Sequence, residues 1–469
     1  MSFTGDKKRL ESFLFFLGLS IFCFGNVNAL AIETLSLDQV VEMAVERSPE
    51  LQQAQQDIVS AQSDLKQAKA GRWAQADVIG IVGPAQDAKK PIVVFSSQSG
   101  SSGVWTGSLQ DRDENGINIF GKLEFFIVQP IFTFGKISNR KDAAESGVEA
   151  ERAAKEKKRG EVIFNVKQLY YAVVVAKQGK DSAEDADHFV KDARKRIQRL
   201  IELGSTNVDE TDIYRLEAFE ADIAQFKAKA DSGYDVAYQA LKRTIGYPQS
   251  GDFQLDIAEL PKQSHPLGDQ NEYIKLALER RPEFKQLNSG IAARKSLLEG
   301  AKADLYPSFF AAAMGSFAGA PGREKMDISY FPDEFNHVQA GVVLGSEWHF
   351  DFGIGWGKVD KAKAEYQKLI YTKDYAERNI PLEVIKYYQD AREAEKTYEA
   401  TGKGAKAARK WIVSAFTNFD MGVGTAKDML QAIERYGKNQ GDYLVSLYNY
   451  NVAIAGLSYA TGEYTKTAP

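Results

Sequence analysis

The stretch from Phe134 to Leu203 decides the fold, and its second part, residues 161–203, has the sequence EVIFNVKQLYYAVVVAKQGKDSAEDADHFVKDARKRIQRLIEL. Its 70 residues contain no proline. Apolar residues recur at alternating four- and three-residue spacing at Val162, Val166, Leu169, Val173 and Ala176, and again at Ala186, Val190, Ala193, Ile197 and Leu200. This heptad-like spacing predicts one helix of roughly 105 Å at 1.5 Å per residue. No globular core is that deep, so we expect the helix to lie along other helices in a long bundle, tube or coiled coil.

The composition of the 469-residue chain argues against several classes of function. A formal net charge of −5 and a pI near 5.7 disfavour a nucleic-acid partner, because proteins that bind nucleic acid are normally basic. Four histidines and one cysteine are too few for metal-ligand clusters or a disulfide framework, so we expect no metal and no other cofactor. We find no nucleophile–base set with a supporting context, and an enzyme is not expected.

Residues 1–31 have the pattern of an export signal. The basic segment Lys7-Lys8-Arg9 precedes an apolar run from Phe13 to Phe24, and Ala29-Leu30-Ala31 matches a cleavage site. Cys23 lies in the apolar run, where Ile21-Phe22 stands in place of the small residues that precede a lipid-anchored cysteine. We therefore favour cleavage after Ala31 over a lipid anchor, which predicts an exported mature protein without cysteine. No other run reaches the ~18 apolar residues that a membrane-spanning helix needs.

The chain is predicted to be a tandem duplication. The octet Ala44–Leu51 matches Ala277–Phe284 at an offset of 233 residues, and this match continues without gaps as far as Ala70 and Ala303. Later positions match at an offset of 216, namely Asp212, Tyr234, Ala237, Leu241 and Gly246 with Asp428, Tyr450, Ala453, Leu457 and Gly462. We therefore expect the order helix, strand, strand, long helix, helix to occur twice.

The boundaries of the two repeats follow from these patterns. The first repeat, residues 32–268, is expected to contain a helix at 35–72 with a break before Pro49, strands across 73–131 with a polar loop at 85–115, a long helix at 134–203, a helix at 210–246 and an equatorial segment at 247–268. The second repeat, residues 269–469, is expected to contain a helix at 277–304, strands across 305–352 with a loop at 320–335, a long helix at 356–421 and a helix at 426–461. Pro381 should kink the second long helix. We expect two short helices, stacked end to end, to lie alongside each long one.

The strands determine the fold class. Ile117, Ile119, Leu123, Phe125 and Ile127 alternate with Asn118, Lys122 and Glu124. Val338, Ala340, Val342, Leu344 and Trp348 alternate with His337, Gln339, Glu347 and His349. Such amphipathic strands are viable in lipid only in a closed barrel, and four strands cannot close one, since the smallest barrels have about eight. The sequence therefore predicts a mixed α and β membrane protein whose barrel is shared between chains.

Three kinds of motif occur once in each half: the helix starts ERSPEL (46–51) and ERRPEF (279–284), the strand exits QPIFTFGK (129–136) and FDFG (350–353), and the helix turns at Gly204/Asp212 and Gly422/Asp428. In these motifs the chain resembles the TolC-like outer-membrane efflux protein family, over nearly its whole mature length. The resemblance implies a homotrimer with a 12-stranded β-barrel in the outer membrane and a long helical barrel in the periplasm. It also implies a passive exit duct of a tripartite efflux pump or a type I secretion system. The implied partners are a periplasmic adaptor (membrane-fusion) protein and an inner-membrane transporter.

The resemblance also implies a functional site at the helix turns. Asp428 corresponds to an aspartate that narrows the periplasmic end of the helical barrel, and Asp212 is its aligned counterpart in the first repeat. The turns that would contact the adaptor are Leu203, Gly204 and Ser205, and Met421, Gly422 and Val423. A second interpretation stays open, because Thr425–Asp428 and Asp209–Asp212 both fit a capping box, in which the aspartate only stabilises a helix start.

The alternative function is a periplasmic coiled-coil adaptor or another structural protein. Adaptors share long helical hairpins, but they do not need two pairs of lipid-facing strands at duplicated positions. The strands therefore favour the channel.

Overall fold

The computed structural model describes residues 33–97, 105–110, 112, 116–205, 208–261, 267–326 and 333–464. The predicted signal peptide, 1–31, lies outside these residues. The first half contains β1 (Glu33–Leu35), α1 (Leu37–Arg47), α2 (Pro49–Ala70), β2 (Gln75–Gln86), β3 (Ile92–Ser97), β4 (Trp105–Gln110), β5 (Ile117–Phe132), α3 (Lys136–Glu202), α4 (Glu210–Thr244) and β6 (Phe253–Leu255). The second half contains α5 (Gln270–Arg280), α6 (Pro282–Ala303), β7 (Ser308–Gly319), β8 (His337–Glu347), α7 (Ile354–Asp420) and α8 (Ala426–Ala460).

The two halves repeat one plan with the same helix lengths. The paired helices have 11 residues in α1 and α5, 22 in α2 and α6, 67 in α3 and α7, and 35 in α4 and α8. The predicted mixed α and β fold with a duplicated order of elements is confirmed.

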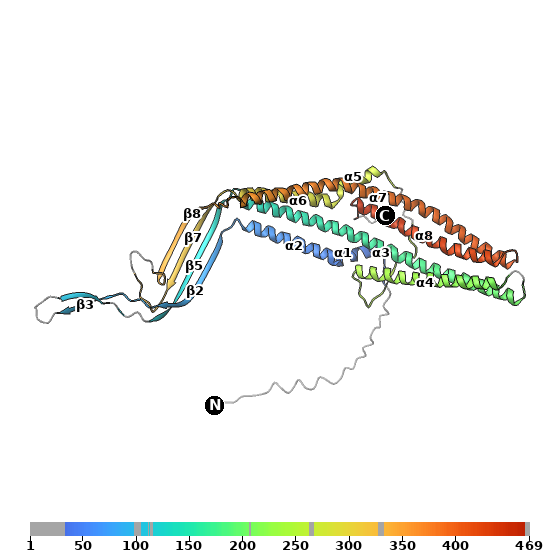
Figure 1. The fold of residues 1–469 in the computed structure, drawn as a ribbon, viewed down its shortest axis with the longest axis horizontal. Helices are drawn as coiled ribbons and strands as arrows, with labels where there is room; N and C mark the ends of the chain where they lie inside the picture. Colours follow the sequence, from blue (N-terminus) through green and yellow to red (C-terminus); the bar gives the residue numbers. More distant parts are fainter. Residues whose placement is uncertain are drawn as a thin grey trace, which may run out of the picture.

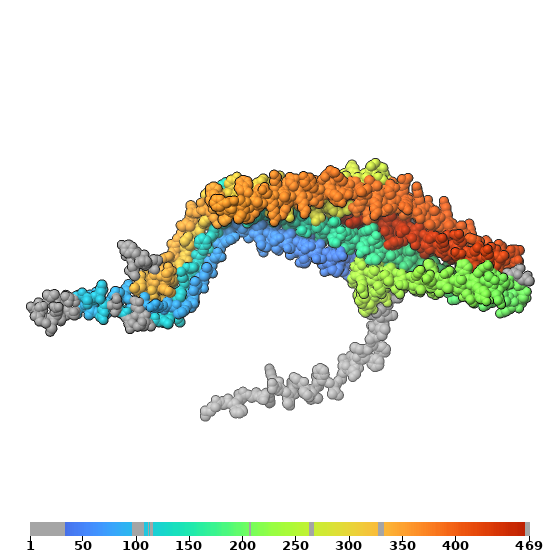
Figure 2. Space-filling view, in the orientation of Figure 1, coloured from blue at the N-terminus to red at the C-terminus, as the bar shows by residue number. Residues whose placement is uncertain are grey.

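The molecule is elongated, with a sheet at one end and long helices running away from it (Figure 1). α2 and α4 both lie along α3, while α6 and α8 lie between α3 and α7. The helices therefore form four columns, in the order α2/α4, α3, α6/α8, α7. In the space-filling view α2 and α4 follow one long edge of the molecule, and α7 follows the opposite edge (Figure 2).

The middle of the molecule, where α2 meets α4 and α6 meets α8, is here called the equator. Each half carries a helix break there, before Pro49 and before Pro282. Ser48 and Arg281 have extended ψ angles of 120° and 128°, because a following proline disfavours the helical conformation. β1 also lies at the equator and pairs in parallel with β6, and Tyr170 on α3 donates a hydrogen bond of 2.7 Å to Asp256 just after β6.

At the equator, an arginine of each helix break packs against a glycine that ends a neighbouring helix. Gly246 and Gly462 follow α4 and α8 with φ angles of +61° and +76°, and a Cβ on either would approach the Arg47 or Arg280 side chain within 3.3 Å. Arg47 Nη1 also donates to the carbonyl oxygen of Gly246 at 3.4 Å. The arginine of each paired Glu-Arg-x-Pro-Glu segment therefore packs against the same kind of helix end in both halves.

Four antiparallel strands form the sheet, in the order β2-β5-β7-β8. The pairing brings the two halves together, since β5 of the first half pairs with β7 of the second. In the described chain β2 and β8 are the edge strands. Each half leaves the sheet through a phenylalanine with φ of +49°, Phe134 or Phe352, followed by a glycine that also has a positive φ.

Two details of the predicted boundaries were wrong, and one pairing was not predicted. The segment 85–115 was predicted to be a polar loop, but it contains the β3–β4 hairpin, in which Val93 and Phe95 oppose Leu109 and Gly107. The helix predicted at 277–304 begins at Gln270 and is broken at Arg281, because Pro282 starts a new helix. The short β1–β6 pairing was not predicted. α7 continues on both sides of Pro381.

The glycine that ends α8 can be tested by substitution. Gly462→Ala should destabilise the protein by more than the roughly 1–2 kcal/mol that a left-handed conformation costs an alanine, because its Cβ would also lie 3.2 Å from the carbonyl carbon of Arg280. Gly437→Ala is the matched control in the same helix, where a Cβ meets nothing within 4 Å, and it should stabilise by up to about 1 kcal/mol. Thermal unfolding of both variants measures the difference, and equal melting temperatures would contradict the packing described above.

Candidate functional site

The two helix turns lie at the end of the molecule opposite the sheet (Figure 1). Both long helices end in the same hydrogen-bond pattern, in which a left-handed glycine follows the last turn. Gly204 and Ser205 donate backbone hydrogen bonds to Ile201 and Leu200, and Gly422 and Val423 donate to Phe419 and Asn418, at 2.9 to 3.0 Å. This is a Schellman motif, which satisfies the last carbonyl groups of a helix.

The turns present apolar side chains to solvent. Leu203 is 72% exposed, Met421 is 63% exposed and Val423 is 76% exposed. The two turns thus lie at the same end of the molecule, namely Leu203, Gly204 and Ser205 with Met421, Gly422 and Val423. This placement is what a single contact surface requires. Their contact with an adaptor remains a prediction.

Asp212 and Asp428 are both in capping boxes. Asp212 N–H donates to Asp209 Oδ1 at 3.1 Å, and Asp209 N–H donates to Asp212 Oδ2 at 3.4 Å. At the second turn Asp428 N–H donates to Thr425 Oγ1 at 3.2 Å, and the Thr425 hydroxyl donates to Asp428 Oδ2 at 2.7 Å. Both aspartates therefore stabilise helix starts in the structure.

The two aspartates differ in their surroundings. Asp212 is buried, with 8% of its surface exposed, and forms an ion pair of 3.0 Å with Arg215. Asp428 is exposed, and its carboxylate bonds only within its own cap among the contacts that the structure describes. A role of either aspartate in a pore constriction remains a prediction, and exposure favours Asp428 for it.

Ion pairs connect the helices close to the turns. Arg194 on α3 forms two hydrogen bonds with Glu220 on α4, of 2.6 and 2.5 Å. Arg196 on α3 donates to Asp420 at the end of α7 at 2.8 Å, and its guanidinium lies 5.0 Å from the centre of the Phe416 ring. Beneath these pairs a fully buried apolar layer includes Ile197, Ile412, Met429, Leu430 and Ile433. The turns are therefore held on a packed four-helix end.

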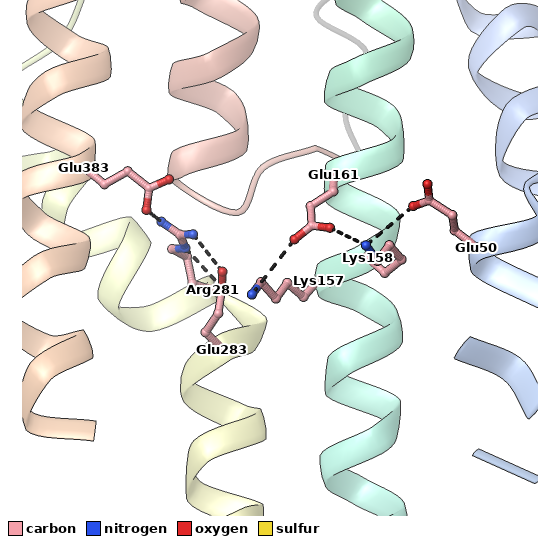
Figure 3. Close-up of polar contacts among 7 residues, drawn as sticks. All are labelled: Glu50, Lys157, Lys158, Glu161, Arg281, Glu283 and Glu383. Carbon is pink, nitrogen blue, oxygen red and sulfur yellow. Dashed lines mark hydrogen bonds and ion pairs between the residues drawn. The ribbon is translucent and has the colours of Figure 1, made fainter. Parts of the chain in front are cut away.

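A cluster of charged residues, here called the equatorial ion cluster, crosses the columns at the level of the helix breaks (Figure 3). Its members are Glu50 on α2, Lys157, Lys158 and Glu161 on α3, Arg281 and Glu283 at the start of α6, and Glu383 on α7. Lys158 Nζ lies 2.8 Å from Glu161 and 3.5 Å from Glu50, so this lysine connects α2 to α3.

Arg281 is the most buried member of the cluster. It is 6% exposed, donates to both carboxylate oxygens of Glu283 at 3.2 and 2.7 Å, and donates to Glu383 at 2.5 Å. Burial alone would lower the pKa of Arg281, but the two carboxylates raise it above its ordinary value. Burial likewise would raise the pKa of Glu283, but the hydrogen bonds and charge of Arg281 hold it below the ordinary range. The arginine therefore stays charged and joins α6 to α7.

Sequence reasoning missed this cluster, although a signal was present. Arg281 occupies the position of Ser48 in the duplicated octet, and Ser48 caps α2 by accepting a hydrogen bond from Leu51 N–H at 3.4 Å. An arginine accepts no such bond. The exchange of a capping residue for a cation beside Glu283 was therefore an indication of an ion pair.

The two faces of the sheet differ in polarity. Asp77, Lys122, Glu124, Ser316 and Gln339 lie on one face, here called the inner face, as the strand register shows. The opposite, outer face carries Val78, Leu123, Phe125, Phe317, Val338, Val342 and Leu344. Val342 and Leu344 are 80% and 81% exposed in the single chain. Among the paired residues of these four strands, the outer face has no charged side chain, which suits contact with lipid.

The described residues offer little for other chemistry. Within the described ranges, no group of three or more His, Cys, Asp or Glu is placed to hold a metal ion. Nor does any helix there have the length and apolar character needed to cross a membrane. His337 has hydrogen-bond partners at both ring nitrogens, the Ser316 hydroxyl at 2.7 Å and the Asp333 carbonyl at 2.9 Å.

Known proteins provide independent comparisons. Residues 273–463 match the family model described as "Outer membrane efflux protein". No curated protein sequence matches the chain. Three solved outer-membrane proteins are similar in structure. The CmeC channel of Campylobacter jejuni has a TM-score of 0.72 and 16% identity over 91% of this chain and 85% of that chain, and VceC of Vibrio cholerae has a TM-score of 0.69 and 17% identity over 91% and 96%. The open state of the MtrE channel of Neisseria gonorrhoeae has a TM-score of 0.71 and 16% identity over 92% and 89%. At these identities the similarity shows a common fold.

The equatorial ion cluster gives a prediction about stability. Arg281→Ala should destabilise the protein by up to about 3 kcal/mol, because it leaves the partly buried Glu283 without its cation. Glu377→Gln is the matched control on α7, since Glu377 forms an exposed pair of 3.7 Å with Lys373 that contributes less than about 1 kcal/mol. Thermal unfolding at pH 7 measures both, and similar losses in the two variants would contradict the central role of Arg281.

The same cluster predicts a dependence on pH. The pKa of Glu283 is lower in the folded protein than in the unfolded chain, so its stabilising effect is present above the unfolded value of roughly 4.3 and is lost as the pH falls through the folded value. Glu283→Gln should therefore lower the melting temperature at pH 7 and make it less sensitive to acid within that window, because below both pKa values Glu283 is protonated in the folded and the unfolded state alike.

Proposed function

We propose that this chain, which matches the outer membrane efflux protein family model over residues 273–463 and repeats the plan of that half in its first half, is an outer-membrane channel. The channel acts as the passive exit duct of a tripartite efflux pump. A type I secretion system is the second setting that such a duct fits. The observation that carries the proposal is the four-stranded sheet with a polar inner face and an apolar outer face, continuous with four columns of helices.

The sheet supports assembly as a homotrimer. In lipid, every backbone N–H and C=O group needs a partner, yet β2 and β8 are edge strands of the described sheet. Pairing β8 of one chain with β2 of the next closes a barrel, and three chains supply twelve strands. The helical columns then meet in the same order, with α7 of one chain beside α2/α4 of the next, and continue the barrel as a periplasmic tube.

The partners follow from the two ends of the tube. The exposed side chains of Leu203, Met421 and Val423 form an apolar rim at the end opposite the sheet. This rim suits contact with a periplasmic adaptor (membrane-fusion) protein, which connects the duct to an inner-membrane transporter. The chain itself performs no catalysis and supplies no energy in this proposal. A soluble periplasmic adaptor is not favoured, because its apolar outer sheet face would then be exposed to water.

A charge placed on either face of the sheet tests the barrel. Val342→Lys puts a cation on the outer face near the middle of β8, where it should cost about 2–4 kcal/mol in lipid and reduce the amount of inserted protein. Gln339→Lys is the matched control, since it changes the same strand on the inner face and should be tolerated. Membrane fractionation measures the amount of inserted protein. The particle mass in mild detergent measures assembly, with three chains expected per particle. Equal insertion of both variants, or a stable inserted monomer, would refute the barrel.

Two substitutions separate the possible roles of Asp428. Asp428→Asn removes the charge but keeps a side-chain oxygen for the cap, so it should lower cation selectivity in planar bilayers if three copies of Asp428 line a narrow passage. Thr425→Ala removes the hydroxyl that bonds Asp428 but keeps the charge, so it should lower the melting temperature and leave selectivity unchanged. Unchanged selectivity in Asp428→Asn would show that Asp428 is only a capping residue.

A further inference from the structure

We propose that the described parts of the connection between β7 and β8 fold inward and narrow the external mouth of the channel. The proposal concerns the described parts of that connection, residues 320–326 and 333–336, here called the mouth segments. It rests on the proposed barrel, because only a barrel gives the inner face of the sheet a lumen. A passive duct would then restrict bulky solutes at its external end as well as at its helical tip.

Two contacts place the mouth segments over the inner face. The Phe335 ring packs edge-on against Phe120, with 5.0 Å between ring centres and an angle of 89°. Glu334 lies 3.5 Å from Lys122 Nζ. Phe120 and Lys122 alternate along β5 with the outer-face residues, on the same side as Glu124. The mouth segments therefore lie toward the lumen and not toward lipid.

Asp333 holds the mouth segments in this shape. Its side chain is 2% exposed and accepts hydrogen bonds from Arg323 at 2.6 Å, from Met326 N–H at 2.9 Å and from Phe335 N–H at 3.1 Å. Burial would raise the pKa of Asp333, but these donors hold it below its ordinary value. The Arg323 guanidinium also lies 4.9 Å from the centre of the Phe335 ring. The buried carboxylate of Asp333 thus holds both mouth segments and the Phe335 ring in place.

The other strand connection supports the mouth segments from the side. Glu324 N–H donates to the Ala88 carbonyl at 3.0 Å, and the Glu324 carboxylate accepts from Lys90 N–H at 3.0 Å and from Arg112 at 2.6 Å. Gly322 packs so closely on Asn118 that a Cβ at this position would overlap the Asn118 side chain. The inward fold is therefore built from contacts of each chain alone, and three copies would surround one axis.

The size of the barrel makes such segments effective. Barrels of about eight strands are filled by their own side chains, while those of 16 to 18 strands leave a wide aqueous channel. Twelve strands lie between these cases, so three inward segments that each carry Phe335 would obstruct a substantial part of the opening. A small solute passes between them, whereas a bulky one requires them to move.

The proposal is tested by the access of thiol reagents to the lumen from outside the cell. This measurement does not depend on passage through the helical tip. Asp77→Cys places a thiol on the inner face, nine residues before the end of β2 at Gln86, which is about 30 Å along the strand at 3.3 Å per residue. Val78→Cys places it on the outer face at the next residue. Because the predicted mature chain has no cysteine, each variant reports on one position. Intact cells are treated with a small impermeant maleimide or with the same maleimide group on a large polyethylene glycol.

In Asp77→Cys protein the small reagent should react readily and the large one about tenfold or more slowly, since the constriction selects by size. Adding Phe335→Ala or Arg323→Ala should remove most of this difference. Phe317→Ala is the matched control, because it removes a ring from the outer face of β7 and should leave both rates unchanged. The particle mass in detergent shows that each variant remains assembled.

The outcomes separate the inference from the proposed function. Similar rates for the two reagents in the parent, or a slow large reagent that neither mouth substitution accelerates, would overturn the inference and leave the barrel intact. Reaction of the small reagent at Val78→Cys but not at Asp77→Cys would show that the inner and outer faces are assigned the wrong way round. That result would overturn both the inference and the proposed function.

Discussion

The structure depends on one constraint, that the backbone of a four-stranded sheet with an apolar face must be fully paired when it is in lipid. A single chain pairs three of the four possible strand interfaces and leaves the edges of β2 and β8 open. In the proposed trimer, closure by neighbouring chains satisfies these edges, and the helices follow the same arrangement, because each helix column continues from a strand. The order α2/α4, α3, α6/α8, α7 repeats the strand order β2, β5, β7, β8. The helical tube is thus a consequence of the sheet.

Much of this fold could be predicted from the sequence because its signals are long and periodic. The heptad spacing from Val162 to Leu200 and the alternation from Ile117 to Ile127 each repeat often enough to outweigh local noise. The elements that were not predicted are short or depend on partners far away in the sequence. β1 and β6 have three residues each and pair across more than 200 positions, and β3 owes its existence to pairing with β4. No local pattern specifies such pairings.

The candidate site was partly predictable for the same reason. The spacing Thr425-x-x-Asp428 indicates a cap from sequence alone, and the structure contains that cap. Whether Asp428 also faces an axis depends on other chains, which no pattern within one chain encodes. Arg281 was missed because its partners come from two segments about 100 residues apart, Glu283 and Glu383. The duplication nevertheless points to it, since the two repeats differ there in charge. Departures from internal symmetry therefore deserve the closest inspection in a duplicated chain.

Equal helix lengths impose the last constraint. α3 and α7 begin at equivalent junctions, after Phe134-Gly135 and Phe352-Gly353, and both have 67 residues. Both turns therefore lie at the same height, and the three chains of the proposed trimer would place six turns in one rim. A deletion of one residue from α3 alone would rotate everything after it by about 100°, since a helix has 3.6 residues per turn. Ile197, now fully buried, would leave the packed layer beneath the turns. The two long helices can therefore change length without disturbing this packing only together and by whole repeats of the apolar pattern, which keeps the two turns level.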